Sequence, residues 1–172
     1  AGPSEVLVLA DKSAEPAFVA ADLLSQAEHG VDSQVVMVTI HKEIVNNVME
    51  ELNLQLEQLP RKEIAQKCLE NSKIVVLDDR TKAVDLINEY APEHLIISVS
   101  DEGYYSDRIR NAGSVFLGNY TPESAGDYAS GTNHTLPTNG YAKMYSGVSL
   151  DSYLKKITYQ RISHQGLLQL GG

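Results

Sequence analysis

The chain has 172 residues, enough for one domain with a substantial core, because folding at this size buries roughly 70% of the unfolded surface. Its formal charge of −9, from 23 acidic and 14 basic residues without a Lys/Arg cluster, argues against a nucleic-acid partner or an anionic membrane. No stretch is long and apolar enough to span a bilayer. The single cysteine, Cys68, excludes an intramolecular disulfide and a thiolate metal cluster, and its helical surroundings predict a buried structural thiol. We therefore expect a soluble protein of a reducing compartment.

Five apolar runs alternate with helical patterns, which predicts a doubly wound parallel sheet of about five strands. Pro16 is typical of a first helical turn, Gly30 is expected to close that helix in the left-handed conformation, and Pro60 should stop a later helix. The expected strands are 6–10, 35–40, 74–77, 94–99 and 114–117, and the expected helices are 16–29, 44–59, 61–71, 81–89 and 105–111. Two further helices, at 150–157 and 162–168, are expected to close the fold.

The segment 118–146 is polar and rich in glycine, and it carries two carboxylates and a histidine. It is longer than an ordinary connection, and its four tyrosines are poor material for a disordered linker. Ligands of open α/β sheets bind beyond the carboxyl ends of the strands, and this segment leaves one of those ends. We therefore expect it to form part of a site there.

Gln26, His29 and Asp127 are candidate metal ligands. Residues three apart on a helix project together, so Gln26 and His29 can present an amide oxygen and an imidazole nitrogen to one ion. With Asp127 the set has two oxygens and one nitrogen, which suits an open zinc, manganese or cobalt site. The alternative is that His29 interacts with the helix dipole, that Gln26 is solvated, and that Asp127 closes an Asx turn.

Glu93 and His94 lie at the start of an expected strand and are candidates for proton transfer. An imidazole near neutral pH can accept a proton from an alcohol, and a neighbouring carboxylate can orient it or activate water. Side chains that follow one another in a strand point to opposite faces of the sheet unless the strand begins irregularly. One of the two side chains is therefore expected to face the cleft, and the other to support it. An isolated Glu-His pair is more often part of an ordinary surface.

His134 either closes a turn or contacts a ligand, and Ser4, just before the first strand, has no role that the pattern alone assigns. No dinucleotide fingerprint, phosphate loop or nucleophile elbow is present in the sequence. Composition and spacing therefore indicate an α/β domain with a metal site of oxygen and nitrogen ligands, and no more.

Five motifs together resemble the histidinol dehydrogenase family, and they follow in the family's order over nearly the whole chain. They are Ala1–Val6, Asp22–Gly30, Ala91–Leu95, Asn111–Gly118 and Pro122–His134. The resemblance implies a Rossmann-like half of an NAD-dependent, zinc-containing enzyme that oxidises L-histidinol through L-histidinal to L-histidine in histidine biosynthesis. It also implies a cytoplasmic homodimer.

The resemblance further assigns roles to residues of this chain. Gln26, His29 and Asp127 match zinc ligands that also hold the substrate, and Glu93 and His94 match the acid/base pair, with His94 in contact with substrate. Ser4 and His134 match substrate contacts. A non-catalytic metal- or ligand-binding module on the same scaffold is the alternative, although the motif residues are intact. A third possibility is a site that folds only when segments beyond this chain are supplied.

Family members are more than twice as long as this chain. We expect residues 1–172 to be a single domain cut from a longer enzyme, with a site segment at 118–146 and closing helices within 149–170. The resemblance implies that the NAD contacts lie in a preceding half, so that this chain has no cofactor-binding residue, and that the remaining zinc ligand comes from the partner subunit. We therefore predict that the isolated chain binds zinc weakly and turns over no histidinol.

Overall fold

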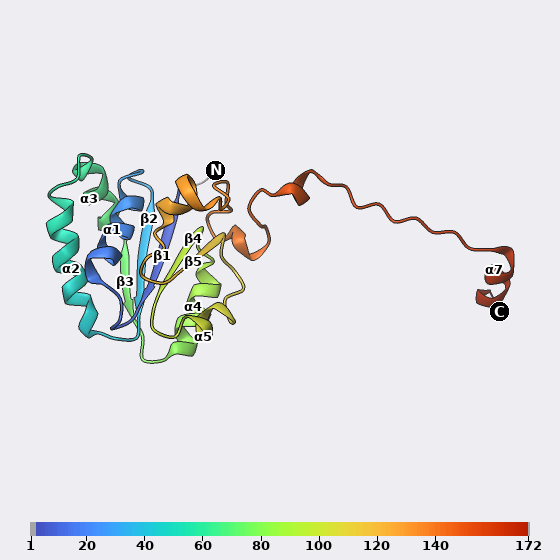
Figure 1. Ribbon diagram of the computed structural model, residues 1–172, viewed down its shortest axis with the longest axis horizontal. Coiled ribbons are helices and arrows are strands. Elements are labelled where there is room, and N and C mark those ends of the chain that lie inside the picture. Colours follow the sequence, from blue (N-terminus) through green and yellow to red (C-terminus); the bar gives the residue numbers. More distant parts are fainter. Residues whose placement is uncertain (1–2, 172) are drawn as a thin grey trace.

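A computed structural model describes residues 3–171 and contains one parallel five-stranded sheet in the order β3-β2-β1-β4-β5 (Figure 1). The strands are β1 (Glu5–Ala10), β2 (Gln34–Thr39), β3 (Lys73–Val76), β4 (His94–Ser98) and β5 (Ser114–Leu117). The first two residues of the Ala1–Val6 motif lie outside the described residues. The order and the parallel pairing confirm the predicted doubly wound α/β fold.

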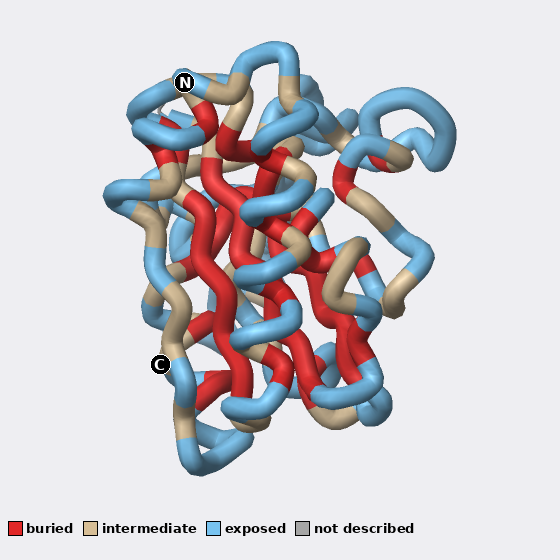
Figure 2. The backbone as a smooth tube through the Cα atoms, turned by 90° about the vertical axis from the view of Figure 1, so that its left-hand side faces the viewer, coloured by how far each residue is buried: buried red, intermediate tan, exposed pale blue. Residues whose placement is uncertain are grey.

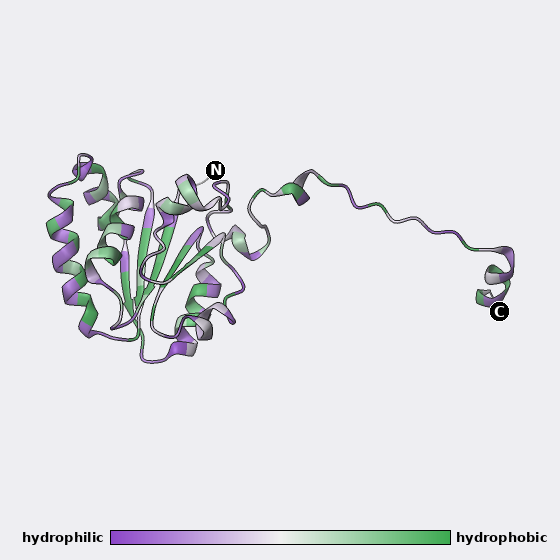
Figure 3. Cartoon of the chain, viewed as in Figure 1, coloured by the Kyte–Doolittle hydropathy of each residue, from purple (hydrophilic) through white to green (hydrophobic). Residues whose placement is uncertain are grey.

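Helices cover both faces of the sheet because the side chains of each strand alternate between them. In β1, Val6 and Val8 pack against α1 (Pro16–Ala27), α2 (Glu43–Leu56) and α3 (Lys62–Glu70). Leu7 and Leu9 pack on the opposite face against α4 (Arg80–Tyr90) and α5 (Glu102–Ser106). The central strands are therefore buried in Figure 2 and hydrophobic in Figure 3, as their continuous apolar runs predict. Cys68 is fully buried, as predicted.

Two predicted helix ends were wrong. Helix α1 ends at Ala27, and Gly30 is not in the left-handed conformation. The C-terminal cap is Glu28, whose N–H donates to the carbonyl oxygens of Leu24 and Gln26. The helix expected at 105–111 is α5, at Glu102–Ser106, because the Asp101 carboxylate accepts the N–H of Tyr104 and starts the helix earlier.

The segment 118–146 folds into three short helical turns that lie at the amino ends of the strands, beside the N-terminus (Figure 1). They are α6 (Glu123–Ala125), the π-helical turn η1 (Gly126–Ser130) and the 3₁₀ turn η2 (Tyr141–Lys143). The Asn139 N–H donates to the Glu5 carboxylate over 2.9 Å, which fixes this segment to the first residue of β1.

Of the two closing helices expected within 149–170, the second forms as α7 (His164–Leu170), whereas the first is only the 3₁₀ turn η3 (Leu150–Tyr153). Neither closes the fold, because the chain between them extends away from the sheet (Figure 1). The apolar side chains of this C-terminal arm, residues 150–171, are 45–90% exposed. Short helices are marginal without tertiary packing, and here no core surface stabilises them. No helix within residues 3–171 is long and apolar enough to cross a membrane.

Candidate active site

A cavity of about 440 Å³ lies at the amino edge of the sheet. All seven site residues predicted from the sequence line it, together with four others. The lining residues are Ser4, Gln26, His29, Glu93, His94, Glu123, Asp127, His134, Thr135, Leu136 and Thr138. The structure therefore brings these distant parts of the chain together around one cavity.

The expected position at the carboxyl ends of the strands was wrong. Ser4 immediately precedes β1, and Glu93 and His94 stand at the beginning of β4. Helix α1 runs back across the sheet, so its last turn brings Gln26 to the same amino edge. The segment 118–146 leaves β5 at the opposite edge and returns to complete the cavity wall.

Glu93 and His94 are both buried, and the backbone of Glu5 holds both of them. The Glu5 N–H donates to the Glu93 carboxylate over 3.0 Å, and the Glu5 carbonyl oxygen lies 3.1 Å from His94 Nδ1. Because a carbonyl only accepts, Nδ1 must carry a proton, and in the neutral ring Nε2 keeps its lone pair. Glu93 lies just before the first residue of β4, so the alternation of side chains along the strand does not yet apply to it. The side chains of Glu93 and His94 can therefore both line the cavity instead of pointing to opposite faces of the sheet.

Burial raises the pKa of Glu93, and the Glu5 N–H and the His94 ring only partly offset that effect. A carboxyl group with a raised pKa is closer to the range in which it can accept and return a proton near neutral pH. Gly113 allows the backbone of β5 to approach this pair closely, because a Cβ at that position would lie 2.5 Å from the Glu93 carbonyl oxygen.

Gln26 is 1% exposed, and its amide nitrogen has no hydrogen-bond partner among residues 3–171. His29 lies just beyond the end of α1 and is exposed, with Nδ1 2.7 Å from the Ser25 carbonyl oxygen. That contact requires a proton on Nδ1 and leaves Nε2 free as a ligand, an arrangement typical of metal-binding histidines. The solvated Gln26 of the alternative interpretation is wrong.

Asp127 and His134 form a pair across the π-helical turn η1. His134 Nδ1 lies 2.9 Å from Asp127 Oδ1, although the imidazole itself is 81% exposed. This hydrogen bond and the negative charge of Asp127 raise the pKa of His134. Single π-helical turns are rare and occur often at functional sites, and Gly131, with φ of 76°, ends this one in the left-handed conformation.

Glu123 is the residue that the sequence interpretation missed. Its side chain is buried and lines the cavity, with Oε1 3.6 Å from His94 Nε2. The signal was available, because Glu123 and Asp127 are the only two carboxylates of the segment 118–146 and stand four residues apart.

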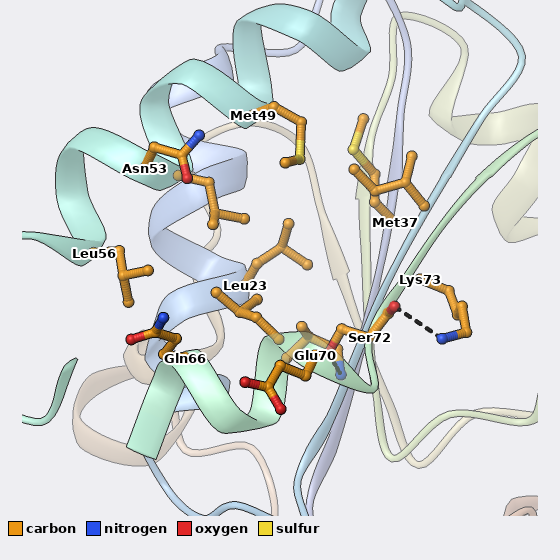
Figure 4. Close-up of a pocket in the computed structure, with 13 residues that line it drawn as sticks. Leu23, Met37, Met49, Asn53, Leu56, Gln66, Glu70, Ser72 and Lys73 are labelled. Atoms are coloured by element: carbon orange, nitrogen blue, oxygen red, sulfur yellow. Dashed lines mark hydrogen bonds between the residues drawn. The ribbon is translucent and has the colours of Figure 1, made fainter. Parts of the chain in front are cut away.

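A second cavity, of about 500 Å³, lies between α2, α3 and the outer strands β2 and β3 (Figure 4). Most of its lining is apolar, including Leu23, Met37 and Met49. None of the predicted site residues lines it, so the concentration of acid, base and amide groups distinguishes the amino-edge cavity.

Fold and cavity together define a Rossmann-like α/β protein with a cavity at the amino edge of its sheet that is lined by carboxylate and imidazole side chains. The family model for histidinol dehydrogenase matches residues 1–172, and the chain belongs to that family. It is 64% identical to a histidinol dehydrogenase of Bacteroides thetaiotaomicron over 171 residues, or 99% of this chain and 40% of that protein. It is 58% identical to a chloroplastic histidinol dehydrogenase of Arabidopsis thaliana over 99% of this chain and 37% of that protein.

A crystal structure of histidinol dehydrogenase from Elizabethkingia anophelis superposes with a TM-score of 0.94 at 58% identity, over 99% of this chain and 40% of that one. The chain thus spans about two fifths of the length of the relatives that it matches. The fold is the same as that of the matching part of a solved family member.

Proposed function

We propose that the complete protein is an NAD-dependent, zinc-containing histidinol dehydrogenase that oxidises L-histidinol through L-histidinal to L-histidine in histidine biosynthesis. Family membership supports the reaction class. The observation that carries the proposal is the convergence of seven predicted site residues, from four separate parts of the sequence, on one cavity.

In the first oxidation, His94 accepts the hydroxyl proton of histidinol at Nε2, while a hydride leaves the carbon that bears this hydroxyl group for NAD⁺. The O–H bond breaks, the N–H bond forms, and the products are the aldehyde, NADH and a protonated imidazole. The geometry supports this role because the Glu5 carbonyl holds the proton on Nδ1 and aims Nε2 at the cavity.

In the second oxidation, Glu93 accepts a proton from the water that adds to the aldehyde carbon. The adduct is then the anion of the aldehyde hydrate, with one hydroxyl and one alkoxide oxygen on the carbon, and loss of a hydride from it to a second NAD⁺ gives the carboxylic acid. The raised pKa of the buried Glu93 carboxyl suits this exchange, and the hydrogen bond from the Glu5 N–H fixes its orientation.

Gln26, His29 and Asp127 fit a zinc site in their donor chemistry. The Gln26 amide can present its oxygen, the His29 Nε2 is free, and the Asp127 carboxylate lines the same cavity. Within residues 3–171 no three His, Cys, Asp or Glu side chains are grouped to hold a metal, so the site depends on the Gln26 amide and on a further ligand. A bound zinc ion would supply positive charge that holds the substrate's imidazole and amine and so orients its alcohol carbon.

Ser4 and His134, which line the same cavity, would contact the substrate together with His94 and the proposed zinc ligands. The NAD site and the remaining zinc ligand are assigned to parts of the complete protein beyond this chain, the latter in the partner subunit of a homodimer. The cytoplasm is the proposed location. The isolated chain is proposed to be inactive.

The test uses a hybrid enzyme in which this chain replaces the matching 40% of the Bacteroides thetaiotaomicron relative. With zinc, NAD⁺ and histidinol we expect NADH formation, and we expect His94→Asn and Glu93→Gln to lower kcat by about 10²- to 10⁴-fold without loss of bound zinc. His164→Asn in the C-terminal arm is the control. Normal turnover after His94→Asn would refute the base assignment. Bound zinc without any NADH formation would favour the non-catalytic module.

A further inference from the structure

Glu123 is a buried carboxylate to which the proposed reaction gives no role. It is the first residue of α6 and is 7% exposed, and the basic group paired with its carboxylate is the ring of His94. A buried carboxylate needs such a partner, because removing a charge from water is costly. The carboxylate also lines the cavity.

The two ring nitrogens of His94 have different surroundings. On the Nδ1 side lie the Glu5 carbonyl oxygen at 3.1 Å and the Glu93 carboxylate at 3.7 Å. On the Nε2 side, Glu123 Oε1 is at 3.6 Å. Because Nδ1 is already protonated, only Nε2 can take up a further proton, and Glu123 is the carboxylate nearest to it.

The other groups around His94 are weaker candidates for this role. Phe116 of β5 packs beside the ring, with centroids 6.1 Å apart, and carries no charge. Asp127 is already paired with His134, and His29 is exposed. The Glu5 side chain is bonded to the N–H of Asn139 behind the cavity wall.

We propose that Glu123 is a positioning residue that stabilises the protonated form of His94 at Nε2. The inference rests on the proposed function, because it concerns the step in which His94 accepts the hydroxyl proton. When the substrate O–H bond breaks and the hydride leaves for NAD⁺, the new Nε2–H⁺ faces the Glu123 carboxylate. The proton then leaves Nε2 for solvent water, which restores His94 for the next oxidation, and Glu123 keeps its charge throughout.

The consequence is measurable in the pH profile of the hybrid enzyme. A nearby negative charge favours the protonated form of an imidazole, and the isosteric change Glu123→Gln removes that charge. We expect the acid limb of kcat/KM to move to lower pH, kcat to fall by about ten- to a hundredfold, and KM to change little. Glu123→Asp should restore part of kcat and move the acid limb back.

Glu89→Gln is the matched control, because it removes the same charge from an exposed side chain paired with Lys143 outside the cavity. It should leave both kcat and the acid limb unchanged. A lower kcat for Glu123→Gln with an unmoved acid limb would overturn the inference and indicate a merely structural residue. A raised KM with normal kcat would also overturn it, in favour of simple substrate binding.

A second measurement on the 172-residue chain separates this inference from the proposed function. In NMR spectra recorded across a pH series, the ring signals of His94 should change to those of the protonated form at a lower pH in Glu123→Gln than in the unsubstituted chain, and at an unchanged pH in Glu89→Gln. The same pH dependence in Glu123→Gln and the unsubstituted chain would refute the inference even if the hybrid enzyme oxidises histidinol. No histidinol oxidation by the unsubstituted hybrid would instead refute the proposed function, and with it the catalytic meaning of Glu123.

Discussion

Replacing Gln26 with methionine should stabilise the 172-residue chain in the absence of metal. The Gln26 side chain is 1% exposed, and its amide nitrogen has no partner among the described residues. A buried polar group without a partner costs about 1–3 kcal/mol. Methionine is unbranched and of similar length, so it can fill the same volume without that cost. At about 2–4 °C per kcal/mol for a domain of this size, the melting temperature should rise by roughly 2–12 °C.

Zinc should reverse the order of the melting temperatures of the unsubstituted chain and the Gln26→Met variant. A ligand that binds only the folded state stabilises it by about 2.7 kcal/mol at a hundred times its Kd. The unsubstituted chain should therefore melt at a higher temperature as zinc is added, whereas Gln26→Met should lose most of this response. Differential scanning calorimetry across a zinc series measures both effects in one experiment.

Gln55→Met is the matched control, because its amide donates to the Ala17 carbonyl at 2.9 Å and to the Glu51 carboxylate at 3.2 Å. Losing satisfied hydrogen bonds should destabilise the chain by about 1 kcal/mol and leave the zinc response intact. The reasoning is refuted if Gln26→Met destabilises the metal-free chain as Gln55→Met does, or if it keeps the full zinc response.

Three further changes test other parts of the structure. Gly113→Ala should lower stability by about 1–3 kcal/mol and reduce kcat of the hybrid enzyme, because its Cβ would lie 2.5 Å from the Glu93 carbonyl oxygen; unchanged urea unfolding would contradict this. Burial, and then the charge of Glu123, raises the pKa of Asp22 from 3.8 to about 7. Because the folded state binds the Asp22 proton more tightly than the unfolded chain does, protonated Asp22 stabilises the fold fully below pH 3.8, and this stabilisation is lost as the pH rises through about 7. The midpoint of urea unfolding should therefore fall over this pH range in the unsubstituted chain, and Asp22→Asn should remove the fall. Deleting residues 150–172 should change the unfolding free energy of the monomer by no more than about 0.5 kcal/mol, because the apolar side chains of this arm are exposed; a larger loss would mean that the arm packs in solution.

The sheet was predictable because its signals are local. A continuous apolar run such as 6–10 is buried on both faces wherever it lies in a parallel sheet, so β1 and its neighbours appear close to their expected bounds. The arm beyond Ser149 also carries apolar side chains, but they are exposed and pack against no surface among the described residues. A local pattern records the spacing of apolar residues and not whether a packing surface is present.

The edge of the sheet that carries the site was harder to predict. Ligands of open α/β sheets usually bind at the carboxyl ends of the strands, and we therefore expected the site there. Ser4 and Glu93, however, directly precede their strands, and His94 is the first residue of β4. Their sequence positions already indicated the amino edge. The role of Glu123 could not be predicted in the same way, because it depends on which nitrogen of His94 the Glu5 carbonyl leaves free.

The carboxyl edge has its own chemistry, and that chemistry explains why the site lies opposite. The strand order reverses between β1 and β4, where α/β sheets usually bind nucleotides. Here the Asp11 carboxylate occupies that position and accepts hydrogen bonds from the backbone and hydroxyl of both Ser13 and Ser100. Burial alone would raise the pKa of Asp11, but these hydrogen bonds lower it below its ordinary value. A fixed negative charge in the crevice would repel a pyrophosphate, which favours our proposal that NAD binds to another part of the complete enzyme.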